Sequence, residues 1–129
     1  IPTVIRSCQQ EAPIPVYGDG SNIRDWLYVD DHCSGIDAVV RRGTIGQTYN
    51  IGGNNEWANL DICKVICDLM DQSMPAAVSH QQLIEFVTDR PGHDWRYAVD
   101  SSKITADLGW QPQETFESGI VKTVEWYCE

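Results

Sequence analysis

The sequence predicts an α/β fold, in which short strands and helices alternate along the chain. Residues 60–70 carry apolar side chains at helical spacing, and residues 116–127 repeat the pattern. Short runs such as 83–87 are rich in β-branched and aromatic residues, which favour strands. With 129 residues and 42% hydrophobic residues, the chain has the length of one domain and enough apolar surface to bury a core.

The N-terminal quarter predicts one helix followed by two extended segments. Pro2 suits the first turn of a helix over residues 2–10. Residues 13–18 contain too much proline for a helix and predict a short extended edge segment that ends at a glycine turn. Residues 23–29 include Trp, Tyr and Val and predict a strand.

The next predicted unit is a helix followed by a strand. Asp30 or Asp31 is expected to cap the helix, because acidic side chains suit its N-terminal dipole. The helix ends at Arg42, before Gly43. Thr48–Ile51 is then predicted as a short strand that leads into a glycine- and asparagine-rich loop.

The second half predicts three helices and two extended segments. Asn59 is expected to cap a helix that ends before Pro75, and Leu83–Val87 is a predicted strand. After a polar loop, residues 97–99 are expected to be extended. Capping residues then precede the last two helices, with Asp100 before Ser101–Leu108 and Thr115 before Phe116–Tyr127.

Composition excludes several classes of function. The chain has 9 Lys and Arg against 19 Asp and Glu, a formal charge of −10, so nucleic-acid phosphates and anionic membrane surfaces would repel it. No run of 18 apolar residues predicts a membrane span. The first residues, IPTVIRSCQQ, show neither an initiator Met nor a signal-peptide pattern, so we expect a chain cut from a longer cytoplasmic protein.

The cysteines and histidines do not predict a metal site. The five cysteines form no CxxC pair, and the three histidines are scattered. Cys63 and Cys67, four residues apart in an apolar run, are expected to be small buried residues on one face of a helix. We therefore expect reduced thiols and no metal.

Three polar segments are candidates for ligand binding. The first runs from Asn22 to Trp26 and carries Arg24, whose guanidinium is a planar fork that fits phosphate oxygens, although it could instead form a salt bridge with Asp25 or Asp30. The segment from Asn54 to Asn59 offers amides for sugar hydroxyls or a phosphate, although Asn59 could be a plain helix cap.

The third segment is the loop from Asp89 to Asp94. Arg90 and His93 could face one ligand across its Pro-Gly turn, or the segment could be a plain surface loop. Together the three segments place two arginines and several amides around an anionic ligand such as a nucleoside diphosphate.

No self-sufficient catalytic site is visible. The sequence has no GxxGxxG fingerprint for a dinucleotide, no YxxxK pair, no GxSxG and no P-loop. The residues themselves therefore predict that this chain binds a ligand and does not catalyse a reaction on its own.

Four segments in order resemble the C-terminal part of the dTDP-glucose 4,6-dehydratases, a family of NAD-dependent extended short-chain dehydrogenases/reductases. They are PVYGDGSNIRDWLYVDDH, TYNIGGNNEWANLDIC, DRPGHDWRYAVDSSKI and LGWQPQETFESGIVKTVEWY, and the likeness covers nearly all of the chain. The general layout is shared with nucleotide-sugar epimerases and decarboxylases, whereas RPGHD and the PQETFESGI ending are more specific to the dehydratases.

The resemblance implies an incomplete extended short-chain dehydrogenase fold. The chain would be the small substrate-binding α/β subdomain plus one strand–helix unit of the Rossmann layer, Thr48–Ile51 and Asp31–Arg42. The family converts dTDP-glucose to dTDP-4-keto-6-deoxyglucose by oxidising C4, eliminating water across C5 and C6 and returning hydride to C6. The NAD site and the catalytic residues would belong to an N-terminal Rossmann portion absent from residues 1–129, so this chain alone would hold no cofactor and be inactive.

The resemblance also implies substrate-binding residues. The segment from Pro13 to Tyr17 would lie along the thymine base, Arg24, Asn59 and Arg90 would contact the diphosphate, and His93 would contact a phosphate or the ribose. The full set is Pro13, Ile14, Pro15, Val16, Tyr17, Arg24, Asn59, Asp89, Arg90, Pro91, Gly92 and His93. In two places the chain departs from the family pattern: Trp57-Ala58 stands where basic residues are common, and Trp95 where an arginine is usual.

Two other readings remain open. The chain could be the same portion of another nucleotide-sugar epimerase or decarboxylase, or a stand-alone module that binds a nucleotide sugar or a protein without catalysis. A dTDP-sugar is the expected partner, whereas the epimerase or decarboxylase alternative would take a uridine or guanosine diphosphate sugar. We also expect self-association through the exposed edge of the Thr48–Ile51 strand.

Overall fold

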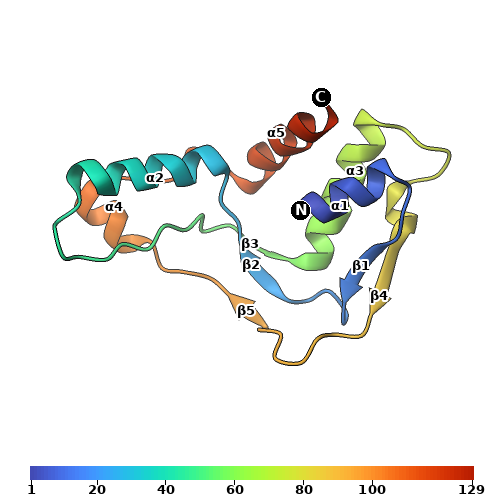
Figure 1. Cartoon of the computed structure of the whole chain (residues 1–129), viewed down its shortest axis with the longest axis horizontal. Helices are drawn as coiled ribbons and strands as arrows, with labels where there is room; N and C mark the ends of the chain where they lie inside the picture. The colour runs from blue at the N-terminus through green and yellow to red at the C-terminus, as the bar shows by residue number, and fades with distance from the viewer.

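The computed structural model describes residues 1–129, which form six helical elements and five short strands (Figure 1). The elements, in chain order, are α1 (Pro2–Gln9), β1 (Ile14–Tyr17), β2 (Ile23–Asp25), α2 (Val29–Arg42), β3 (Glu56–Ala58), α3 (Asn59–Ser73), the 3₁₀ helix η1 (His80–Leu83), β4 (Ile84–Val87), β5 (Arg96–Tyr97), α4 (Ser102–Leu108) and α5 (Phe116–Cys128). The predicted alternation of strands and helices is confirmed.

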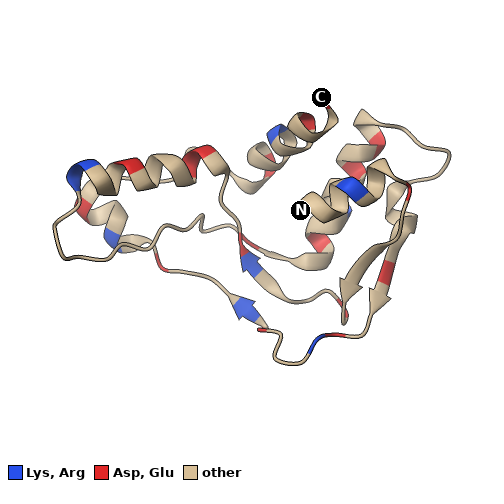
Figure 2. Cartoon of the chain, in the orientation of Figure 1, with Lys and Arg blue, Asp and Glu red and all other residues tan.

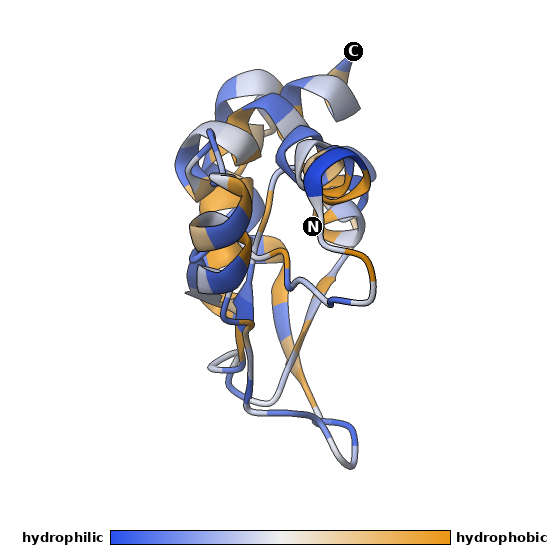
Figure 3. Ribbon diagram, turned by 90° about the vertical axis from the view of Figure 1, so that its left-hand side faces the viewer, coloured by the Kyte–Doolittle hydropathy of each residue, from blue (hydrophilic) through white to orange (hydrophobic).

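The strands form two small sheets. β1 and β4 pair in parallel, with Ile14 opposite Ile84 and Tyr17 opposite Val87. The other sheet has the order β3-β2-β5, in which β2 runs antiparallel to β3 and parallel to β5. Figures 1 and 3 both place the helices at one end of the molecule and the strands with their connecting loops at the other.

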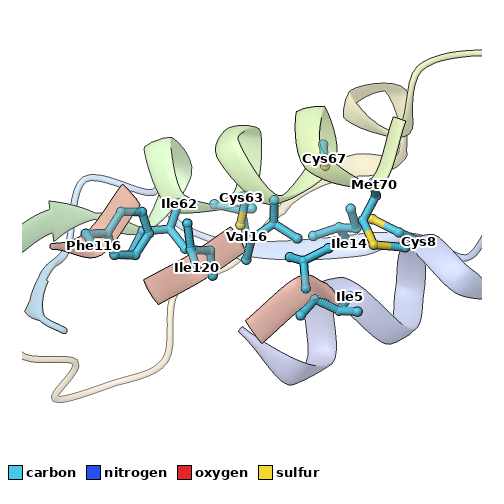
Figure 4. Close-up of a cluster of buried hydrophobic side chains, with 12 residues drawn as sticks. Ile5, Cys8, Ile14, Val16, Ile62, Cys63, Cys67, Met70, Phe116 and Ile120 are labelled. Atoms are coloured by element: carbon cyan, nitrogen blue, oxygen red, sulfur yellow. The ribbon is translucent and has the colours of Figure 1, made fainter. Parts of the chain in front are cut away.

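The larger hydrophobic core lies between α1, α3, α5 and the inner face of β1 (Figure 4). Helix α3 supplies residues at helical spacing, including Ile62, Ile66 and Met70, all of them buried. Cys63 and Cys67 are buried on the same helix, as the sequence predicts. All five cysteines are free thiols.

A smaller core joins α2 to α4. Its buried members are Ala38, Ile104 and Trp110, and the Trp110 indole N–H donates to the Ser34 hydroxyl at 2.9 Å. The opposite face of α2 is solvent-exposed although it carries Val29, Ile36 and Val40, with Val40 79% exposed. We call these three residues the α2 stripe.

The predicted strand at Thr48–Ile51 is wrong, because this segment forms no strand. A strand needs a neighbour that accepts and donates main-chain hydrogen bonds, and no segment of the chain pairs with residues 48–51. The predicted strand 23–29 is shortened to β2, because α2 already begins at Val29. A third strand, β3, forms inside the region expected to be a loop because β2 pairs with it.

Two predicted helix caps are also wrong. Asp31 does not cap α2; its carboxylate accepts main-chain N–H groups from Gln113 at 3.0 Å and Glu114 at 2.9 Å. Asn59 is the first residue of α3 rather than its cap. The cap at Thr115 is confirmed, since its hydroxyl accepts the N–H of Ser118.

Neither a membrane-spanning helix nor a metal cluster is found. No helix combines the length and the hydropathy needed to cross a bilayer. Across residues 1–129, no three His, Cys, Asp or Glu side chains are grouped so that they could hold a metal ion.

Candidate nucleotide-binding site

In the candidate site, two side chains donate hydrogen bonds to the main-chain carbonyl of Asp94. Arg24 on β2 donates to it through Nη1 and Nη2, each at 3.1 Å, and Asn22 donates through Nδ2 at 3.2 Å. Nη1 of Arg24 also donates to the carbonyl of its neighbour Ile23 at 2.7 Å. Arg24 forms no ion pair with Asp25 or Asp30, so the alternative of a salt bridge is wrong, and its guanidinium lies against the loop that carries Arg90 and His93.

In that loop, residues 88–95, the His93 side chain contacts both another loop residue and β1. Nδ1 of His93 lies 2.6 Å from Oδ1 of Asp89, and its ring packs edge-on against Tyr17 at 5.9 Å between centroids. The His93 side chain is only 6% exposed. Because Nδ1 is occupied by Asp89, Nε2 is the ring nitrogen left to contact a ligand.

Arg90 lies in the same loop and its guanidinium makes no hydrogen bond or ion pair within the chain, although its main-chain N–H donates to Asp89. Pro91 and Gly92 complete the turn, and Gly92 has φ +70°, a conformation that favours glycine. Figure 2 shows basic positions on β2, on β5 and in the β4–β5 loop. In a chain of charge −10, an arginine with no acidic partner is suited to an external anion.

Arg96 on β5 contrasts with Arg90. Its Nε lies 2.5 Å from Oε1 of Glu56 on β3. This hydrogen bond holds the pKa of the Glu56 carboxyl below its ordinary value and raises the pKa of Arg96. Arg96 is therefore engaged within the sheet, and the two arginines have different roles.

The start of α3 lies beside the same region. The main-chain N–H of Asn59 donates to the carbonyl of Asn22 at 3.0 Å, and that of Leu60 donates to Gly20 at 3.0 Å. The Asn59 side-chain amide makes no hydrogen bond within the chain, so it is available to a ligand. Gly20 is required here, because it has φ +76° and a Cβ would lie 2.7 Å from Leu60 Cβ.

The β1 segment divides into two faces. Ile14 and Val16 are buried in the larger core, at 1% and 3% exposure, so their side chains are not available to a ligand. Pro13, Pro15 and Tyr17 are exposed on the other face. Of the predicted base-contacting segment, only these three side chains remain.

The sequence named Asn22 and Asp25 only as members of the polar segment that carries Arg24, without a role of their own. Asn22 lies between Arg24, Asn59 and the 88–95 loop. Asp25 organises the loop before β3, because its carboxylate accepts the N–H groups of Gly53 at 3.0 Å and Asn55 at 2.8 Å.

Two hollows of several hundred Å³ lie away from this site. One of about 400 Å³ is bordered by the α2 stripe residue Val29, by Leu27 and Ile51, and by the segment around Val99. A second, of about 470 Å³, is polar and is lined by Glu56, Arg96 and neighbouring residues. Neither includes Arg24, Arg90 or His93.

The chain is similar to known nucleotide-sugar enzymes over almost its whole length. A family model described as GDP-mannose 4,6 dehydratase matches residues 1–123. A dTDP-glucose 4,6-dehydratase of Salmonella typhimurium is 57% identical over 127 residues, which are 98% of this chain and 35% of that protein.

Solved structures show the same fold. A dTDP-glucose 4,6-dehydratase from Bacillus anthracis in complex with NAD aligns with a TM-score of 0.86 and 43% identity, covering 98% of this chain and 38% of that one. An epimerase from Methanothermobacter thermautotrophicus aligns with a TM-score of 0.83 and 28% identity, covering 98% of this chain and 36% of that one.

This chain thus spans little more than a third of the length of the relatives that it matches. Its α/β fold matches that part of the dTDP-glucose 4,6-dehydratase structure over 98% of its own residues. On the match to the family model over residues 1–123, the chain belongs to the GDP-mannose 4,6 dehydratase family.

Proposed function

We propose that this chain is the C-terminal, nucleotide-sugar-binding portion of a dTDP-glucose 4,6-dehydratase, and that it binds dTDP-glucose. One observation carries the proposal: Arg24, Asn59 and the loop with Arg90 and His93 converge around the Asp94 carbonyl and Asn22. The 57% identity to the Salmonella enzyme supports dTDP-glucose as the nucleotide sugar.

Each residue of the candidate site has a role in this proposal. Tyr17 and Pro15 of β1, with Pro13 just before the strand, offer an apolar face to the thymine base. Arg24 and Arg90 bind the diphosphate through their planar guanidinium groups, and the Asn59 amide donates to it. Nε2 of His93 contacts a phosphate or the ribose. The chain thereby binds and orients the substrate that the whole enzyme converts to dTDP-4-keto-6-deoxyglucose.

NAD does not fit the residues of this chain. A dinucleotide's pyrophosphate is bound by a glycine-rich turn between a strand and the helix that follows it. Among residues 1–129 the Gly18-Asp19-Gly20 turn joins β1 to another strand, and β3 passes directly into α3. We therefore assign no step of the NAD chemistry to this chain and place it in the N-terminal portion of a longer enzyme.

The exposed face of α2 supports this division of the enzyme. The α2 stripe and the hollow bordered by Leu27 and Val99 form an apolar surface without a partner inside the chain. Exposed apolar patches mark surfaces that pack against another protein segment. An NAD-binding portion of the length that the relatives have would cover it.

Calorimetric titration of the 129-residue chain tests the proposal. We expect dTDP to bind more tightly than UDP or GDP, NAD to produce no heat, and the chain alone not to dehydrate dTDP-glucose. Preference for UDP or GDP would instead support the same portion of an epimerase or another dehydratase. If none of the three diphosphates binds, the proposed function is wrong.

A further inference from the structure

Asn22 is a buried polar residue to which neither the motifs nor the comparisons assign a role. We propose that Asn22 is a positioning residue for the diphosphate, because it keeps the Asp94 carbonyl paired when Arg24 turns to the ligand. This inference rests on the proposed function, since it concerns how the same site releases Arg24.

Asn22 is fixed in place from both ends. It is 5% exposed, and its carbonyl accepts the N–H of Asn59 at 3.0 Å. Its side-chain Nδ2 donates to the Asp94 carbonyl at 3.2 Å, and Ile23 donates its N–H to the next carbonyl, that of Trp95, at 2.8 Å. Asn22 therefore joins the start of α3 to the loop that carries Arg90.

The Asp94 carbonyl receives more donors than it can use fully. Arg24 directs two N–H groups at it and Asn22 directs a third, whereas a carbonyl oxygen has two lone pairs. Arg24 can therefore leave without orphaning the oxygen, because Asn22 remains. Without Asn22, the same movement would leave the Asp94 carbonyl with no hydrogen-bond partner within the chain, and the loop would lose its side-chain attachment to β2.

A double-mutant cycle on dTDP affinity tests this coupling. The four proteins are the 129-residue chain, Asn22→Leu, Arg24→Ala and the double variant; leucine keeps the branched shape of asparagine and removes the amide. We expect Asn22→Leu to weaken dTDP binding roughly 5- to 10-fold, the loss of one hydrogen bond. In the Arg24→Ala background the same change should cost less than about 2-fold, because no arginine has to leave.

Asn50 provides a matched control. Its Nδ2 also donates to the carbonyl of an aspartate, Asp100, at 3.1 Å, but it lies outside the site. Asn50→Leu should leave dTDP affinity unchanged. An equal loss from Asn22→Leu in both backgrounds, or no loss in either, overturns the inference. If Asn22→Leu does not fold, Asn22→Ser replaces it in the cycle, because the shorter hydroxyl does not span the 3.2 Å bond.

A ligand-free measurement separates this inference from the proposed function. Hydrogen exchange of the Ile23 N–H reports the attachment of the loop, because this group donates to Trp95. Each single variant should exchange within about 3-fold of the wild type, and the double variant at least about tenfold faster. If the effects of the two single variants on this exchange rate simply add in the double variant, Asn22 and Arg24 do not substitute for each other at the Asp94 carbonyl, and the inference is wrong. If dTDP does not bind the wild type, the proposed function is wrong. The exchange measurement needs no ligand and still tests whether Asn22 and Arg24 share the Asp94 carbonyl.

Discussion

Arg24 and Arg90 enter the proposed phosphate site in different states, because the Arg24 guanidinium is bound to main-chain carbonyls and that of Arg90 is free. We expect Arg24→Ala and Arg90→Ala each to weaken dTDP binding roughly 10- to 100-fold, since a hydrogen bond to a charged group contributes about 1.5–3 kcal/mol. Lysine should restore only part of the affinity, because it lacks the planar fork. Calorimetric titration with dTDP measures both.

The control for this prediction is thymidine, which has no phosphate and should bind the wild type and both variants equally. Arg6→Ala on α1 is a second control, because Arg6 is exposed and lies outside the site. If thymidine loses as much affinity as dTDP, the arginines support the structure and the phosphate assignment is wrong.

Asp31 joins α2 to the segment before α5. It is 4% exposed and its two oxygens accept the N–H groups of Gln113 and Glu114. Asp31→Ala should lower the free energy of unfolding by roughly 2–4 kcal/mol, because two part-buried hydrogen bonds to a charged group are lost. Urea denaturation measures the change. Asp30→Ala, at the exposed neighbouring position, should change stability far less, and an equal effect from both would contradict the assignment.

At the scale of elements, η1 is attached to α3 through Asp71. The Asp71 carboxylate accepts the main-chain N–H of His80 at 2.9 Å, and this bond, together with Ser79 and the His80 ring, lowers the pKa of Asp71. A carboxyl whose pKa is lower in the folded state stabilises the protein above its unfolded pKa. That stabilisation is lost as the pH falls through the folded pKa.

We therefore expect Asp71→Asn to be less stable than the wild type near neutral pH. The two proteins should converge as the pH falls below 3.8, the ordinary value for this carboxyl. Denaturation curves across this pH range measure the difference. Asp61→Asn, on the same helix and without a hydrogen-bond partner, should show no such convergence. A constant difference between wild type and Asp71→Asn at every pH would show that its hydrogen bonds do not depend on charge.

At the scale of the whole molecule, the two cores are unequal. The larger contains 12 buried residues from α1, β1, α3 and α5, whereas the smaller contains 3 and leaves the α2 stripe exposed. The sequence predicts self-association through the edge of a strand at Thr48–Ile51, but that strand does not form. Self-association remains a prediction, now based on the α2 stripe.

Light scattering should therefore give a mass that rises with concentration above the 14.5 kDa of one chain. Val40→Lys and Ile36→Lys should lower the apparent mass, because a charge in the stripe opposes burial. Gln72→Lys adds the same charge at an exposed position of α3 and should have no effect. A constant mass of one chain at all concentrations would contradict the prediction.

The sequence by itself determined the long helices and named the residue types of the candidate site. The apolar spacing of residues 60–70 and 116–127 fixed α3 and α5, and Thr115 marked the start of α5 correctly. These features are local, because a helix forms its hydrogen bonds within its own segment. Residue type alone also singled out Arg24 and Arg90, since few groups match a diphosphate as a guanidinium does.

Only the tertiary structure decided which polar side chains have hydrogen-bond partners within the chain and which are left for a ligand. Asn59 and Asp31 have the residue types of helix caps, yet Asn59 is the first residue of α3 and Asp31 binds a segment more than 80 residues away. Thr48–Ile51 has the composition of a strand but no neighbour to pair with. Asn22 lies in a polar segment that the sequence singles out, but its partner, Asp94, is 72 residues along the chain and no local pattern indicates it. Hydrogen bonds between distant segments are made only when the chain folds, and so periodicity and residue type could not reveal them.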